Sequence, residues 1–136
     1  MTDERPLDIT PDERYLLSAM RRRPGMYLGT KSFRVLVGFI MGYNDALVTA
    51  TISPALHNLL PDGMNEFAAE KYLGGVENMS AYGWMSCIEM HQPDDQKAVD
   101  EFFSFLDEYL LHLGYEPIPD WDTVYGNQKA SEVQDG

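Results

Sequence analysis

The stretch PDDQKAVDEFFSFLDEYLLHLG, residues 93–114, constrains the fold more than any other part of the chain. Its apolar residues recur at alternating intervals of four and three, which is the spacing of one face of an α-helix. These residues are Val99, Phe103, Leu106, Leu110 and Leu113, with Phe102 and Tyr109 beside them. Pro93, Asp94 and Asp95 suit a helix start, and Gly114 suits its end. The segment predicts a long helix with one apolar face and one acidic face.

An earlier helix is predicted over TPDERYLLSAMRRR. Thr10 suits the N-cap, Pro11 suits the first helical position, and Glu13 has the capping-box spacing. The three arginines at 21–23 fall in the last turn, where cations complement the negative helix end, and they can also pair with acids elsewhere in the chain.

After these arginines, the Pro24–Gly25 pair predicts that the helix stops. The following MYLG is expected to be a short extended segment. Its residues Met26, Tyr27 and Leu28 are expected to pack into the core.

A second helix is predicted from Ser32 through FRVLVGFIMGYNDALVTA. Its apolar residues lie all round, which predicts a central helix buried on most sides. Gly38 and Gly42 share one face and would let another backbone approach closely. The apolar excess is also compatible with a homodimer.

The middle of the chain predicts a loop over ISPALHNLLPDG and two short helices. MNEFAAEKYLGG reads as a helix ended by Gly74 and Gly75. Ser80 suits the cap of a second short helix over AYGWMSCIEMH, and the alternative is an extended segment there, because Gly83 weakens a helix. The predicted fold is therefore mainly α: a compact single domain over residues 1–126, with about five helices and at most short extended segments. Residues 127–136 are expected to form a flexible C-terminal tail.

Cysteine usage and hydropathy bear on the compartment. Cys87 is the only cysteine, so no internal disulfide can form and a reducing cytoplasm is expected. The amino-terminal residues lack the apolar core of a signal peptide. The apolar stretch 35–43 is far shorter than the roughly 20 residues needed to cross a bilayer, so no membrane association is expected.

Charge is unevenly distributed along the 136 residues. Residues 1–34 carry seven basic and five acidic residues, and the remainder carries three basic and 17 acidic ones, so balances of +2 and -14 give the net charge of -12. An acidic surface repels phosphate backbones and attracts basic partners. Direct binding of nucleic acid is therefore not expected, and a basic protein partner is.

The residues that usually carry catalysis do not form a recognisable pattern. His57, His91 and His112 lack the spacing of a helical zinc site, and Cys87 lies in an apolar context without an adjacent base. No glycine-rich phosphate loop follows a strand. We expect no enzymatic activity, no catalytic residues, no metal and no cofactor.

RRRPGMYLG followed by GYNDAL resembles the start of the ATPase domain of the DNA gyrase B subunit and related topoisomerases. In that family the next helix carries a glutamate that activates water and, four residues on, an asparagine that helps to hold magnesium. The alignment places Val37 and Met41 at these positions, so both functional groups are missing. The resemblance spans residues 21–46 and does not support ATPase activity.

A second resemblance covers the order and spacing of motifs along the whole chain. RRPGMYLG, GFIMGY, EF…YL, GW…I and FFSFLDEYL follow one another as in small acidic bacterial families of polymorphic toxin systems, including immunity proteins. The resemblance implies a non-catalytic cytoplasmic protein that binds a cognate toxin, often a basic nuclease, and blocks its active site.

The predicted function is therefore binding and neutralisation of a cognate, basic bacterial toxin. The residues expected to bind the partner are Asp94, Asp95, Asp100, Glu101, Asp107, Glu108, Trp121 and Tyr125. One alternative is an acidic mimic of nucleic acid that inhibits a DNA- or RNA-binding protein. Another is a nucleotide-binding protein that uses the arginine cluster near Tyr27 and Asn44.

Overall fold

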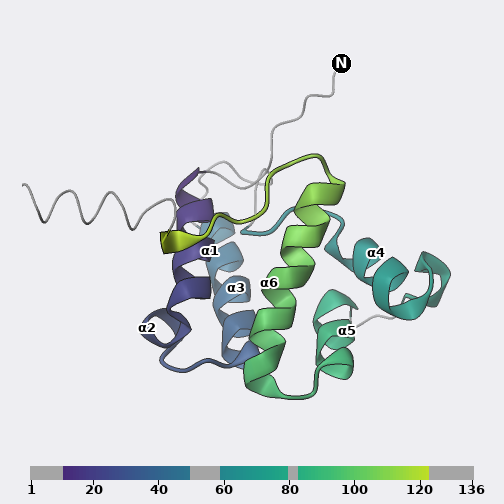
Figure 1. Ribbon diagram of the computed structural model, residues 1–136, viewed down its shortest axis with the longest axis horizontal. Coiled ribbons are helices and arrows are strands. Elements are labelled where there is room, and N and C mark those ends of the chain that lie inside the picture. Colours follow the sequence, from purple (N-terminus) through teal and green to yellow (C-terminus); the bar gives the residue numbers. More distant parts are fainter. Residues whose placement is uncertain (1–10, 50–58, 80–82, 123–136) are drawn as a thin grey trace, which may run out of the picture.

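A computed structural model describes residues 11–49, 59–79 and 83–122 of the chain, and its arrangement is shown in Figure 1. These ranges form helices and connecting turns, with no strand among them. The elements are α1 (Pro11–Arg22), α2 (Pro24–Leu28), α3 (Phe33–Thr49), α4 (Met64–Ala68), the π-helix η1 (Ala69–Leu73), the 3₁₀-helix η2 (Val76–Asn78), α5 (Gly83–His91) and α6 (Asp95–His112). The mainly α, compact single-domain fold is confirmed.

The long α6 helix is the centre of the molecule. It packs against α1, α3 and α5, and its apolar face supplies much of the core (Figure 1). Asp94 caps it as predicted, because its side chain accepts a hydrogen bond from the N–H of Lys97. The prediction that Leu113 belongs to the apolar face of this helix is wrong. The helix ends at His112, and Leu113, which follows in a turn, is 40% exposed.

The α1 helix is joined to the segment that follows α6. The Arg14 guanidinium donates to the carbonyl oxygens of Glu116 and Pro117 at 2.9 and 2.7 Å, and Ser18 Oγ donates to that of Pro119 at 2.7 Å. These bonds hold residues 116–119 against a helix about one hundred positions earlier in the chain.

The segment after Pro24 is a helix, α2, so the prediction of an extended segment is wrong. Pro24 stands at the first helical position, which its fixed backbone angle favours, and Gly29 closes the helix in a left-handed conformation with its N–H bonded to the carbonyl of Gly25. Met26 is 68% exposed and Tyr27 also lies at the surface, so neither enters the core; only Leu28 packs against it.

The α3 helix begins where the sequence predicts, but it is buried along one stripe instead of on most sides. Phe33, Leu36 and Ile40 are buried, whereas Gly38 and Gly42 face outwards. The central position belongs to α6, so α3 has packed neighbours on its inner side only. No described atom lies within 4 Å of where a Cβ would stand at either glycine, so the expected close approach of a second backbone does not occur within the described chain.

The two short helices of the middle segment are confirmed. The first runs from α4 into η1 and ends before Gly74, which takes a left-handed conformation, and the second is α5. The predicted caps at Thr10 and Ser80 and the predicted tail over residues 127–136 lie outside the described residues.

Candidate functional site

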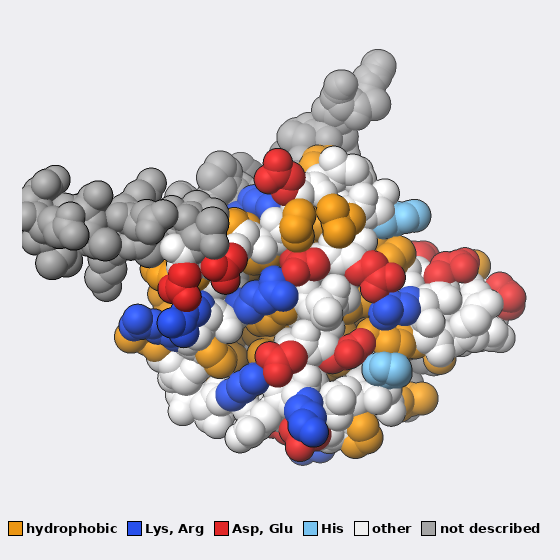
Figure 2. Space-filling model, viewed as in Figure 1, with side chains coloured by type: hydrophobic (Ala, Val, Ile, Leu, Met, Phe, Trp, Pro, Cys, Tyr) orange, Lys and Arg blue, Asp and Glu red, His pale blue; other side chains and the backbone are white. Residues whose placement is uncertain are grey.

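The predicted partner-binding acids on α6 make contacts within the molecule. Asp100 pairs with Lys31 at 2.9 Å, Asp107 with Arg21 at 2.7 Å, and Glu108 with Lys71 at 2.9 Å. Figure 2 shows acidic and basic side chains interleaved over this part of the surface. Basic residues of α1, of the α2–α3 turn and of η1 therefore neutralise much of the acidic face of α6.

The remaining acids of this set also have partners. Asp94 is the N-cap, and Glu101 accepts a hydrogen bond from the Tyr72 hydroxyl. Asp95 accepts from the N–H of Arg34, and a hydrogen bond from Ser32 is the main cause that lowers the pKa of its carboxyl. All six acids thus hold α6 to its surroundings or cap it, and their role in binding a partner stays a prediction.

The two aromatic residues of the predicted set lie near or beyond the end of the described chain. The Trp121 ring is partly exposed and meets the ring of Tyr15 edge-on at 4.9 Å between centroids. Tyr125 lies outside the described residues.

A different group of acids stands at the surface around α4. Asp62, Glu66 and Glu70 are all exposed, and none of them forms an ion pair within the described part of the chain. Glu66 lies on α4 and Glu70 four positions further along, on η1, whereas Asp62 precedes α4 and is separated from it by the left-handed turn at Gly63. We call these three residues the α4 ridge.

The α4 ridge is fixed in place by the centre of the molecule. The Tyr109 hydroxyl of α6 donates a hydrogen bond to the carbonyl oxygen of Asp62. The next residue, Gly63, takes a left-handed conformation with φ 91°, and this turn leads into α4. Burial, followed by the charges of Glu66 and Asp62, raises the pKa of Tyr109 and keeps it a hydrogen-bond donor.

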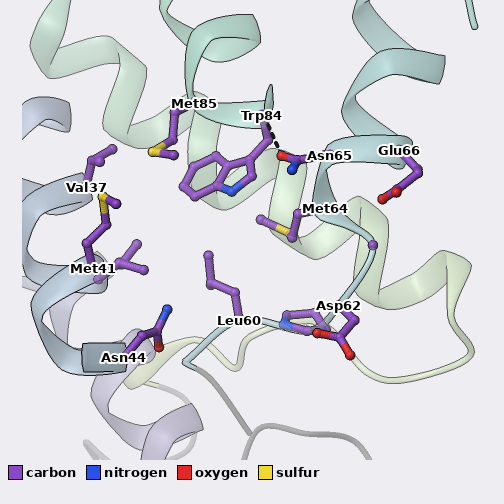
Figure 3. Close-up of a pocket in the computed structure, with 13 residues that line it drawn as sticks. Val37, Met41, Asn44, Leu60, Asp62, Met64, Asn65, Glu66, Trp84 and Met85 are labelled. Atoms are coloured by element: carbon purple, nitrogen blue, oxygen red, sulfur yellow. Dashed lines mark hydrogen bonds between the residues drawn. The ribbon is translucent and has the colours of Figure 1, made fainter. Parts of the chain in front are cut away.

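A pocket of about 340 Å³, lined by both polar and apolar residues, opens on one side of the ridge (Figure 3). We call it the Met–Trp pocket, and its apolar lining includes Val37, Met41, Leu60, Met64, Trp84 and Met85. Asp62 and Glu66 stand at its edge together with two amides. Methionine side chains adapt their shape to what they contact, so this lining suits an inserted apolar group.

The two amides of the pocket hold its walls together. Asn65 Oδ1 accepts from the N–H of Trp84 at 2.9 Å, which joins α4 to the start of α5 (Figure 3). Asn44 Oδ1 accepts from the N–H of Leu59 at 2.8 Å, which joins α3 to the segment before the ridge. Three separate parts of the chain are therefore held around one opening.

A second, shallower hollow of about 470 Å³ lies on the other side of the ridge. Its lining includes Phe67, Val76, Tyr109, His112 and Leu113, and Glu66 and Glu70 border it. The Phe67 ring packs on the rings of Tyr109 and His112 at 4.7 and 5.1 Å between centroids. The ridge thus places carboxylates without ion-pair partners in the described chain between a pocket of mixed polarity and a more apolar hollow. This arrangement suits a partner surface that carries cations beside apolar side chains.

One group of titratable side chains meets between η1, α5 and α6: the Tyr72 hydroxyl donates to Glu101, and His91 Nε2 lies 3.9 Å from the same carboxylate. No cluster of three or more metal-ligating side chains occurs among the described residues. Cys87 is buried, and burial raises the pKa of its thiol, which disfavours the reactive thiolate. His57 lies outside the described residues.

None of the described helices has the length and apolarity needed to cross a bilayer.

The residues of the nucleotide-binding alternative lie in two places. Tyr27 lines a hollow with Arg22 and Arg23, whereas Asn44 lines the Met–Trp pocket. Val37 and Met41, which occupy the aligned positions of the gyrase glutamate and asparagine, are apolar lining of the same pocket.

No family model, curated protein or solved structure matches the chain. The candidate site therefore rests on the geometry of this chain alone. Sequence reasoning missed the α4 ridge, although the regular spacing of Asp62, Glu66 and Glu70 is visible in the sequence. What the sequence does not display is which acids have basic neighbours, because those neighbours come from distant segments.

Proposed function

We propose that this protein is a non-catalytic binding protein that recognises a basic protein partner through the α4 ridge and the hollows beside it. The resemblance to immunity-protein families suggests a toxin as the partner and the cytoplasm as the compartment. Binding would then neutralise the toxin by covering its functional surface.

The observation that carries the proposal is the difference between two sets of acids. Those on α6 face Lys31, Arg21 and Lys71, whereas the ridge acids have no ion-pair partner in the described chain. An unpaired carboxylate gains more from an incoming cation than one that already has a counter-ion. The apolar side chains in the hollows on both sides add surface that can be desolvated on binding.

The alternative of nucleic-acid mimicry receives less support from the same observation. A mimic needs a row of carboxylates that repeats the charge of a phosphate backbone. The longest acidic face of the chain, on α6, is interrupted by the basic side chains that pair with it.

The test begins with affinity capture from cells of the source organism, identification of the partner and reconstitution from two purified proteins. Affinity is then measured by calorimetry for the wild type, for Glu66→Lys and for Asp100→Lys. Both variants change the charge by the same amount, but the first reverses a ridge acid and the second a paired acid on α6.

We expect Glu66→Lys to weaken binding at least tenfold and Asp100→Lys to weaken it less than threefold. Growth of cells that express the partner should be protected by the wild type and by Asp100→Lys. If Asp100→Lys abolishes binding and Glu66→Lys does not, the partner binds the acidic face of α6 and the ridge assignment is wrong. A reconstituted partner with an acidic surface would contradict the proposal altogether.

A further inference from the structure

The α3 helix leaves one long face uncovered in the described part of the chain. Arg34 lies near its start and Asp45 near its end, and both are exposed. The exposed residues between them are uncharged: Val35, Gly38, Met41 and Gly42. Val35 and Met41 are 40% and 53% exposed, so this face presents apolar side chains between the two charges.

We propose that this face binds the same face of a second copy of the chain, with the two α3 helices antiparallel. Two-fold symmetry then brings Arg34 of each copy beside Asp45 of the other copy, so that the pair forms twice. The Arg34 guanidinium lies 3.8 Å from Glu89 at an exposed position, and its charge also acts on Asp95. Asp45 has no ion-pair partner among the described residues. Both charges are therefore available to a second copy.

Shape complementarity follows from the same register. The midpoint between Arg34 and Asp45 along α3 is also the midpoint between Gly38 and Met41. An antiparallel pair of helices that brings the charges together therefore also places Met41 of one copy opposite Gly38 of the other. A Cβ at Gly38 would meet no described atom within 4 Å, so this position has room for an incoming side chain. One register thus satisfies both the charges and the packing, and the proposal rests on this coincidence.

The proposal also accounts for the apolar residues that lie all round α3. The inner stripe packs on α6, and the outer residues would be covered by the second copy. A single pair of helices makes an interface at the small end of specific contacts, so we expect a dissociation constant of about 1 to 100 µM. The dimer needs no ridge residue and is tested without the partner, although it uses Met41, which also lines the Met–Trp pocket.

Sedimentation velocity over a range of concentrations tests the proposal. The wild type is expected to dimerise, whereas Arg34→Asp alone and Asp45→Arg alone are expected to stay monomeric, because each places like charges together. An equimolar mixture of the two variants should form a one-to-one heterodimer, since both of its charge pairs are then opposite. Glu77→Arg, which makes the same charge change as Asp45→Arg but on η2, is the matched control for that variant and should dimerise like the wild type.

A second variant tests the packing without changing charge. Gly38→Leu should raise the dissociation constant at least tenfold while the folded helical content of the monomer is retained, because leucine is favoured over glycine in a helix. The proposal is overturned if the wild type is still monomeric at a protein concentration of about 1 mM, because its dissociation constant would then exceed the range expected for this dimer. It is also overturned if the single charge variants dimerise like the wild type, or if their mixture stays monomeric.

Discussion

The hydroxyl oxygen of Tyr109 occupies the space that a side chain at Gly63 would need. A Cβ added to Gly63 would overlap this oxygen, and the same hydroxyl donates its hydrogen bond to the carbonyl of Asp62. Residue 63 also has φ 91°, which side-chain-bearing residues adopt at a cost. One glycine therefore allows α6 to hold the start of the α4 ridge.

We expect Gly63→Ala to lower the free energy of unfolding by about 2 to 4 kcal/mol, from backbone strain together with the displaced tyrosine. Gly25→Ala is the matched control, because Gly25 has a helical conformation and no described neighbour within 4 Å of an added Cβ. Its effect should stay within about 0.5 kcal/mol. Urea denaturation measures both, and equal losses would show that Tyr109 does not restrict residue 63.

The ion pairs of α6 should differ in their contribution to stability. Asp107 is mostly buried, pairs with Arg21 at 2.7 Å and also accepts the N–H of Ile118 at 2.9 Å. Asp107→Ala should therefore cost about 1 to 2 kcal/mol. Asp100 is 70% exposed and has only Lys31, so Asp100→Ala should cost less than about 0.5 kcal/mol. Thermal and urea unfolding compare the two, and a larger loss at Asp100 would contradict this ranking.

The stability of the protein should fall at alkaline pH, in part because of Tyr72. Burial, with the hydrogen bond and charge of Glu101 as further causes, raises the pKa of this phenol in the folded state. The unfolded chain therefore releases the phenolic proton first, and stability declines as the pH rises above about 10. Tyr72→Phe should be less stable at neutral pH by about 1 kcal/mol, because a hydrogen bond is lost.

The same variant should lose stability less steeply between about pH 9.5 and 11.5, since it has one such proton fewer to release. Unfolding in urea at a series of pH values gives both slopes. Coincident slopes for the wild type and Tyr72→Phe would show that Tyr72 does not contribute to the alkaline loss.

Binding to the basic partner should respond to salt. Unpaired carboxylates steer a cationic surface towards the ridge, and salt screens this attraction beyond about 10 Å at 0.1 M. The association rate should fall as salt rises for the wild type, and the dependence should be weaker for Glu66→Gln. Stopped-flow or surface-based kinetics measure this, and an equal salt dependence would place the charge complementarity elsewhere.

The parts of the fold that could be predicted are those in which local signals and packing agree. The periodicity of α6 and the capping residue Asp94 predict its limits to within a residue or two. The α2 helix could not be predicted, because Pro24 followed by Gly25 is typical of a turn and also compatible with a helix that ends at Gly29. Whether a turn or a helix forms depends on the capping interactions at both ends of the segment.

The position of α3 and the acids of the candidate site depend on tertiary structure. An apolar helix does not show which of its sides will meet α6, and its sequence alone predicts burial all round. Asp100 and Lys31 are 69 positions apart, and Arg21 and Asp107 are 86 apart. No local pattern shows that these charges meet, so the acidic face of α6 could not be distinguished in advance from the unpaired α4 ridge.

The contacts of α1 with residues 116–122 bear on when the protein can fold during its synthesis. Three side chains of α1 have hydrogen-bond partners that are about one hundred positions later in the chain: Arg14, Ser18 and Arg22. Closing a loop of this length costs conformational entropy, and the contacts that compensate this cost form only when both of its ends have met. A ribosome-bound chain that stops before residue 116 would expose the side of α1 that residues 116–122 cover. Such a chain is expected to be a target for proteases and chaperones until the last turn of α6 and the segment beyond it have emerged.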